Sequence, residues 1–366
     1  MQNCIYCERL NDIFGEKMSK DFETFVDSIA NGTNKKFSPP FDAYQKSTGD
    51  MLSFCNQFFT EYFTVLKNLP IKDIRKIGRV MHDIVLQYGP DHLSKRFNLL
   101  KDAGEIIDAV LETIQFHFAG RPFDGFECLE KKLTKNNFHL MHLLPTLLID
   151  EKLPLYRVRK EKGLKDKKEL FHIPFEKRHK CATERFSIPG YASLYLSESL
   201  ETAILETKVT EPEYSASCFK ANNKELKFVD LSLPNRELNV TDKYCLLVFY
   251  PLIVACGLKV KFPDAPFKPE YVVSQDLFLT IRLHYRGISG VSYTSTQYKT
   301  PNYKDDKERN YVLYVRNTES EKGYSEKLAE DVLLTSPYSP KSSETISDVE
   351  KKITKLQFEK FDVQNV

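Results

Sequence analysis

The residues best suited to chemistry lie between positions 185 and 206, in the stretch RFSIPGYASLYLSESLETAILE. Arg185 stands ten positions before Tyr195, and Tyr195 stands eleven positions before Glu206. A guanidinium binds phosphate through two parallel hydrogen bonds, an aromatic ring stacks on a flat ligand, and a carboxylate stabilises developing positive charge. These three residue types favour a site for a nucleotide-like substrate.

Local signals indicate how this stretch folds. Pro189 fixes its own φ and Gly190 tolerates a positive φ, which predicts a tight turn. Residues 193–196 then read as a short strand. Ser197 or Ser199 is suited to cap a following helix, whose buried side carries Leu200, Ala203 and Ile204. The order turn, strand and helix therefore lets Arg185, Tyr195 and Glu206 converge on one cleft.

Two further residues are candidates for the same cleft. Ser295 ends a strand over residues 291–295 that follows the glycine-rich turn 287–290. It is well placed to face a cleft, although a role in the turn or the strand ladder also fits. Arg157 lies in a predicted strand over residues 155–159 and is a second candidate for phosphate binding; an ordinary surface arginine is the alternative.

Length and composition describe a globular protein. A chain of 366 residues exceeds the usual size of one hydrophobic core, so two domains are expected. The net charge of +2 gives no overall attraction to nucleic acid. Eight cysteines without regular spacing fit a reducing cytoplasm. Residues 1–12 do not read as a secretory signal, and the apolar run 244–258 is short and contains Pro251, which predicts a buried element and no membrane span.

Hydrophobic periodicity divides the chain. Apolar residues recur at helical spacing in residues 51–69, 71–85 and 106–118, which predicts an α-helical domain over residues 1–150. From Leu155 short strands alternate with helices, which predicts a mixed α/β domain (α+β) over residues 151–335. Residues 336–366 begin Pro/Ser-rich and are expected to be a linker that leads to a short amphipathic tail over residues 349–361, which either docks or remains mobile.

The helical half offers a rival site. Arg75 and His82 are seven positions apart, so they share one flank of a helix and could together handle an RNA phosphate and a proton. A solvated helix surface is the preferred explanation, because one Arg and one His at this spacing often arise by chance. Cys4 and Cys7 form a C-x-x-C pair, but a zinc site needs four ligands and no second close pair follows, so no metal is expected there.

The residues from 155 onward resemble the RES domain, a family named for its Arg, Glu and Ser. The motifs that carry the resemblance are the strand 155–157, the turn RFSIPG at 185–190, the strand end LYLSES at 194–199, the helix ETAILE at 201–206, Gln275, and GVSYTS at 290–295. The first 150 residues resemble the HEPN-type helical domain that precedes RES in some bacterial proteins.

The resemblance implies a fold similar to ADP-ribosyltransferases and a cleft for NAD+ as substrate. RES domains are the toxins of bacterial toxin–antitoxin pairs, and they cleave the nicotinamide–ribose bond by hydrolysis or phosphorolysis. It further implies that Arg185, Tyr195, Glu206 and Ser295 are catalytic, with Arg185, Tyr195 and Arg157 binding NAD+. An antitoxin or regulatory protein and a homo-oligomer are the expected partners. Three alternatives are transfer of ADP-ribose to a protein, a HEPN-type ribonuclease using Arg75 and His82, and a non-catalytic sensor of NAD+ or ADP-ribose.

Overall fold

The chain folds into two compact units that interleave along the sequence. The computed structural model describes residues 18–39, 42–88, 97–134, 138–209, 212–234, 236–298, 306–316 and 321–363. A helical unit comprises Met1–Thr146, Leu231–Tyr285 and Thr300–Lys304, and a sheet unit comprises Leu147–Asp230, Arg286–Lys299 and Asp305–Val366. The predicted linear division into residues 1–150 and 151–335 is therefore not the division into compact units, because residues 231–285 pack with the helices.

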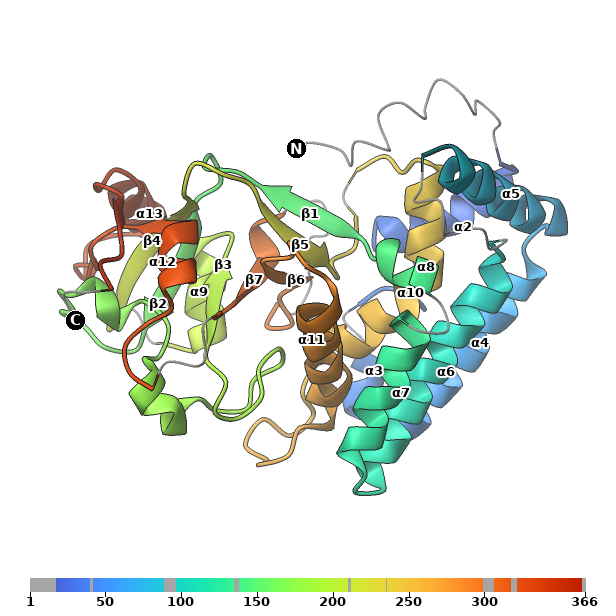
Figure 1. The fold of residues 1–366 in the computed structure, drawn as a ribbon, viewed down its shortest axis with the longest axis horizontal. Helices are drawn as coiled ribbons and strands as arrows, with labels where there is room; N and C mark the ends of the chain where they lie inside the picture. Colours follow the sequence, from blue (N-terminus) through green and yellow to red (C-terminus); the bar gives the residue numbers. More distant parts are fainter. Residues whose placement is uncertain are drawn as a thin grey trace. The chain divides into compact units, whose positions relative to one another are not determined.

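The helical unit confirms the periodicity of the first half of the chain. Its helices are α2 (Lys20–Ala30), α3 (Asp42–Lys46), α4 (Met51–Asn68), α5 (Ile71–Tyr88), α6 (Leu99–Phe118), α7 (Pro122–Thr134), α8 (Phe138–His142), α10 (Val240–Gly257) and α11 (Val272–His284). Asp50 caps α4 and Asn98 caps α6, each by accepting a backbone N–H of the first turn. Helix α6 contacts α4 on one side and α7 on another (Figure 1).

Helix α10 is the apolar run that the sequence places in a buried element. By length and composition it could cross a membrane, but 72% of its apolar window is buried. It packs on α6 and α5, and the hydroxyl of Tyr62 donates to the carbonyl of Leu247 at 2.8 Å. The hydroxyl of Tyr244 in turn donates to Asp102. The helix is thus a core element of the helical unit.

The described strands form one nine-stranded sheet, in the order β1-β5-β6-β7-β3-β2-β4-β8-β9. The strands are β1 (Thr146–Ile149), β2 (Leu155–Arg159), β3 (Ser193–Ser197), β4 (Ser215–Ala221), β5 (Leu226–Asp230), β6 (Gly290–Thr294), β7 (Arg309–Tyr314), β8 (Val332–Leu334) and β9 (Glu359–Lys360). Strands β5 and β6 pair in parallel, whereas β6, β7, β3, β2 and β4 are successively antiparallel. The predicted α+β architecture is confirmed, and helices α9 (Leu200–Thr207), α12 (Glu326–Asp331) and α13 (Ile346–Thr354) complete the sheet unit.

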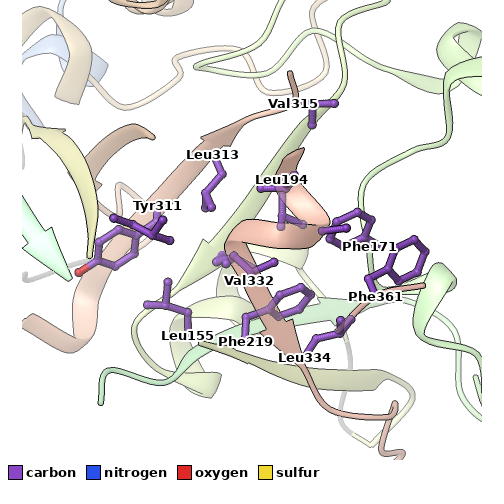
Figure 2. Packing of buried hydrophobic residues seen from close by; sticks show 14 of the residues in the cluster. Leu155, Phe171, Leu194, Phe219, Tyr311, Leu313, Val315, Val332, Leu334 and Phe361 are labelled. Carbon is purple, nitrogen blue, oxygen red and sulfur yellow. The ribbon is translucent and has the colours of Figure 1, made fainter. Parts of the chain in front are cut away.

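Alternation along the strands gives the sheet two buried faces. The first face carries a cluster that includes Leu155, Leu194 and Leu313 (Figure 2). Phe171 joins this cluster from the loop after β2 and stacks on Phe361, with ring centroids 4.3 Å apart. The second face carries a separate cluster whose strand residues are Tyr156, Val158, Ala216 and Cys218, covered by α9 and α13.

The end of the chain is part of the fold: the amphipathic tail docks on the sheet unit, which is one of the two expectations for it, and the Pro/Ser-rich segment before it bridges to the sheet and is not a free linker. Tyr338 forms a β-bridge with Ala216, β9 pairs with β8, and α13 begins at a capping box between Thr345 and Asp348. Ile353 of α13 is fully buried. The prolines and serines lie in the turn that leads into this helix, where such residues are as common as in linkers.

Candidate functional site

Helix α9 carries Glu206 to the edge of the second face. Of the two serines suited to cap it, Ser199 is the cap, and its hydroxyl accepts from the N–H of Thr202 at 3.1 Å. Leu200 and Ile204 are buried in the second-face cluster, and this burial fixes which side of the helix faces the sheet. Glu206 lies near its end and is half-buried.

Two buried donors meet on one oxygen of Glu206. The hydroxyl of Ser295 donates to Oε1 at 2.7 Å, and the side-chain amide of Asn310 donates to the same atom at 2.6 Å. Ser295 is 2% exposed and Asn310 is 3% exposed. None of the described residues donates a hydrogen bond to Oε2. The structure thus places Ser295 against Glu206, two residues that the sequence assigns to one cleft.

Asn310 was missed by sequence reasoning, and so was the role of Ser197. The two residues are direct partners in the register between β3 and β7, and the hydroxyl of Ser197 donates to Oδ1 of Asn310 at 2.7 Å. Asn310 stands directly before the apolar residues 311–315, and a polar residue at that position is the one signal that could have drawn attention to it. Its partner depends on strand register, which the local sequence does not encode.

Arg185 and Tyr195 are joined through the turn that separates them. The hydroxyl of Tyr195 accepts from the N–H of Phe186 at 3.1 Å and lies 3.3 Å from the hydroxyl of Ser187. Arg185 is 5% exposed, and its Nη2 donates to the hydroxyl of Thr296 at 3.4 Å. Because Thr296 follows Ser295 directly, the predicted Arg, Tyr, Glu and Ser residues lie in one connected region of the sheet unit.

Arg157 occupies a different position from the other candidates. Tyr156 is opposite Ser197 in the β2–β3 register and points to the second face. Because side chains alternate along a strand, Arg157 projects from the first face, as Leu155 does. Its Nη1 donates to the backbone carbonyl of Tyr195 at 3.3 Å. Burial lowers the pKa of Arg157, with the charge of Arg159 as a second cause. Its side chain is half-buried, and no carboxylate among the described residues forms an ion pair with it.

An ionic cluster lies behind the site, at the same end of β7. Arg309 pairs with Asp306 at 3.0 Å, with Glu198 at 3.7 Å and with Asp230 at 3.7 Å. The hydroxyl of Tyr311 donates to Glu198 at 2.6 Å. Burial, reinforced by the charges of Asp306 and Asp230, raises the pKa of Glu198 to about 7. Because Arg309 and Tyr311 flank Asn310 in the strand, they project from the face opposite to Asn310.

The rival residues remain predictions. Arg75 is exposed on α5, and His82 is half-buried. Nδ1 of His82 is buried without a hydrogen-bond partner among the described residues. Cys4 and Cys7 lie outside the described residues, and within them no three His, Cys, Asp or Glu side chains gather as a metal site. His172 lies in a loop of the sheet unit and is fully buried, and this burial lowers its pKa to about 4.

Comparison with known proteins agrees with this fold. The family model of the RES domain matches residues 154–331. The chain is also 27% identical over 320 residues to "Putative toxin YopC" of Bacillus subtilis (strain 168), a match that spans 80% of this chain and 67% of that protein. No solved structure matches the chain. A HEPN-type identity of the N-terminal helices stays a prediction.

Proposed function

We propose that this protein is a toxin-like cytoplasmic enzyme that degrades NAD+ by cleaving its nicotinamide–ribose bond. The observation that carries the proposal is the carboxylate of Glu206, whose Oε1 is held by Ser295 and Asn310 while Oε2 receives no hydrogen bond from the described residues. The RES domain over residues 154–331 and the toxin named among the relatives support the same function.

The chemistry of the bond explains why a fixed carboxylate suits it. When the nicotinamide–ribose bond breaks, its electron pair leaves with the nitrogen of nicotinamide, which becomes neutral. Positive charge develops on C1′ and the ring oxygen of the ribose, as in glycoside cleavage. A preorganised carboxylate stabilises that charge and loses little energy to reorganisation during the reaction. Glu206 takes this role, acting on the ribose through Oε2.

Binding of the rest of the dinucleotide falls to the cationic and aromatic residues. Arg185 offers a planar fork to the pyrophosphate or a ribose oxygen. Arg157 projects from the opposite face of the sheet, with Leu155, so it is not assigned a contact with the dinucleotide. The ring of Tyr195 stacks on nicotinamide and holds the bond in a reactive orientation. Its hydroxyl bonds at Phe186 and Ser187 keep the ring in place.

The acceptor of the ADP-ribosyl group decides the reaction class. Water gives a glycohydrolase, inorganic phosphate gives a phosphorylase, and a nucleophilic side chain gives a protein ADP-ribosyltransferase. An enzyme that destroys NAD+ harms its own cell, so we expect an antitoxin or a homo-oligomeric state to restrain it. Nucleic acid is not among the expected partners.

The test uses the full-length purified protein and NAD+, with and without inorganic phosphate. Nicotinamide and the ADP-ribose product are separated by chromatography, and labelled NAD+ reports incorporation into protein. Glu206→Gln should abolish nicotinamide release, whereas Glu201→Gln, an exposed carboxylate on the same helix, should not. Product that forms only with phosphate identifies phosphorolysis.

Three results would reject the proposal or replace it. Wild-type protein that binds NAD+ but releases no nicotinamide is a sensor. Full activity of Glu206→Gln removes the assigned role of this carboxylate. Toxicity that depends on Arg75 and His82 but not on Glu206 would transfer the activity to the helical unit.

A further inference from the structure

Three side chains from three elements form one hydrogen-bonded chain that ends at Glu206. Ser197 on β3 donates to Asn310 on β7 at 2.7 Å, and Asn310 donates to Glu206 on α9 at 2.6 Å. Ser197 is 4% exposed and Asn310 is 3% exposed. Burying polar groups at this depth costs free energy unless each is paired. In this chain the amide oxygen and the amide nitrogen of Asn310 each have a partner.

The order of donors and acceptors along this chain follows from the carboxylate. An ionised carboxylate only accepts hydrogen bonds, so the amide nitrogen of Asn310 must face Glu206. The amide oxygen then faces Ser197, whose hydroxyl donates to it. With Ser197 removed, the amide would lose the bond that holds this orientation. A flipped amide would place its oxygen against Oε1, where two acceptors repel.

We propose that Asn310, oriented by Ser197, is a positioning residue that holds Oε1 of Glu206 and thereby presents Oε2 to the ribose of the dinucleotide. This inference rests on the proposed cleavage of NAD+. Ser295 holds the same oxygen from β6, so the two donors approach Glu206 from different elements. The carboxylate is then fixed in direction as well as in place, and small displacements of a reacting group are costly to the rate.

Alanine variants test the positioning role through the division between kcat and KM. Asn310→Ala should lower kcat for nicotinamide release by at least about tenfold with little change in KM, because it alters the direction of Glu206 and not the binding of NAD+. Ser197→Ala should have a smaller effect in the same direction. The matched control for Ser197→Ala is Ser193→Ala. Ser193 lies on the same strand and face as Ser197, and its buried hydroxyl has no hydrogen-bond partner among the described residues.

Asn310→Asp gives a signature that a merely structural role does not produce. A protonated aspartic acid donates to Glu206 as the amide does, whereas two ionised carboxylates in contact repel. The aspartate and Glu206 therefore hold one proton between them at low pH and lose it as the pH rises. We expect Asn310→Asp to recover activity at acid pH and to lose it through a new descending limb, which Asn310→Ala lacks.

Unfolding experiments keep this inference separate from the proposed function. If Asn310 and Glu206 are bonded, the change in urea midpoint caused by Asn310→Ala should be smaller in a Glu206→Ala background than in wild type. The positioning role is overturned if the changes in urea midpoint caused by Asn310→Ala and Glu206→Ala are additive. It is also overturned if Asn310→Ala leaves kcat unchanged and the pH profile of Asn310→Asp runs parallel to that of wild type. In either case Glu206→Gln can still abolish turnover. If wild type releases no nicotinamide, the proposed function fails by itself, and the unfolding cycle alone decides whether Asn310 holds Glu206.

Discussion

The hydroxyl of Ser295 donates a 2.7 Å hydrogen bond to Oε1 of Glu206, although the two residues are 89 positions apart. The same hydroxyl accepts from the N–H of Gln297 at 3.2 Å. A serine hydroxyl has one proton to donate, and in this structure that proton is directed to Glu206. Ser295 therefore meets a ligand only as an acceptor.

Loss of the Ser295 hydroxyl should reduce turnover. Ser295→Ala removes one of the two donors to Oε1, and loss of a preorganised donor at a reacting centre costs about 100-fold in kcat. Because Asn310 still holds the oxygen, we expect a decrease of about 10- to 100-fold. The measurement is nicotinamide release at saturating NAD+. Thr294→Ala is the control, since its side chain alternates to the other face of the strand.

Equal kcat values for Ser295→Ala and Thr294→Ala would show that the hydroxyl has no part in the reaction. An increase in KM alone would instead assign Ser295 to the binding of NAD+.

Arg157 should support the sheet and not the binding of NAD+. Its side chain projects from the face opposite to Glu206, and its Nη1 donates to the carbonyl of Tyr195 at 3.3 Å. Arg157→Met removes this hydrogen bond, so the variant should lose about 0.5–1.5 kcal/mol of stability while its affinity for NAD+ stays that of wild type. Calorimetric titration with NAD+ and thermal unfolding measure the two effects.

Arg159→Met is the matched comparison for this prediction. Arg159 lies on the same strand and face, and its Nε likewise donates to a backbone carbonyl, that of Glu169 at 3.1 Å. This variant should also lower the unfolding temperature and leave NAD+ affinity unchanged. The prediction for Arg157 fails if Arg157→Met weakens NAD+ binding while Arg159→Met does not.

The parts of the site that the sequence predicts are those set by local chemistry. The Pro189-Gly190 turn forms with a φ of 82° at Gly190, and Ser199 caps α9, because both depend on residues within a few positions. Periodicity likewise predicts α4, α5 and α6. The resemblance to the RES family brings in Ser295, whose contact with Glu206 no local signal indicates.

What the sequence does not predict depends on contacts between distant segments. The pairing of Ser197 with Asn310 is set by the register of β3 against β7, and a shift of one residue would direct Asn310 to the opposite face. Helix α10 is apolar on all sides, so no stripe identifies its neighbours. Its packing with the helical unit, which makes the units interleave, therefore cannot be inferred from its own residues.

Glu198 should make stability depend on pH. Burial raises its pKa from 4.5 to about 7, so between these values the folded state holds a proton that the unfolded state releases. The free energy of unfolding therefore falls as the pH rises from 4.5 through 7, and the whole contribution of Glu198 is lost above pH 7. Each unit of pKa difference corresponds to about 1.36 kcal/mol, which limits this contribution to about 3 kcal/mol. Glu198→Gln should remove it.

The measurement is urea unfolding of wild type and Glu198→Gln between about pH 5 and pH 8. The difference between the two proteins isolates Glu198, since His172 and other groups titrate in both. Relative to wild type, the variant should gain stability as the pH rises. Glu213→Gln, at an exposed carboxylate, is the control. A difference that stays constant with pH would mean that Glu198 is ionised throughout this range, balanced by Arg309.

The C-terminal helix should be required for the stability of the sheet unit. Ile353 is 0% exposed and packs in the second-face cluster with Tyr156 and Ile204, and Glu350 of α13 accepts from the N–H of Leu200 at the start of α9. Ile353→Ala should therefore reduce the free energy of unfolding by about 2–4 kcal/mol, the usual effect of a large-to-small change in a core.

The same change should also lower turnover, because α13 supports the helix that carries Glu206. Lys351→Ala, at an exposed position of α13, is the matched control and should change stability by less than about 0.5 kcal/mol. Urea unfolding, monitored by circular dichroism, gives the stability of both variants, and nicotinamide release gives their turnover. If the two variants unfold at the same midpoint, α13 does not contribute to the core, and residues 336–366 behave as the linker that their composition suggests.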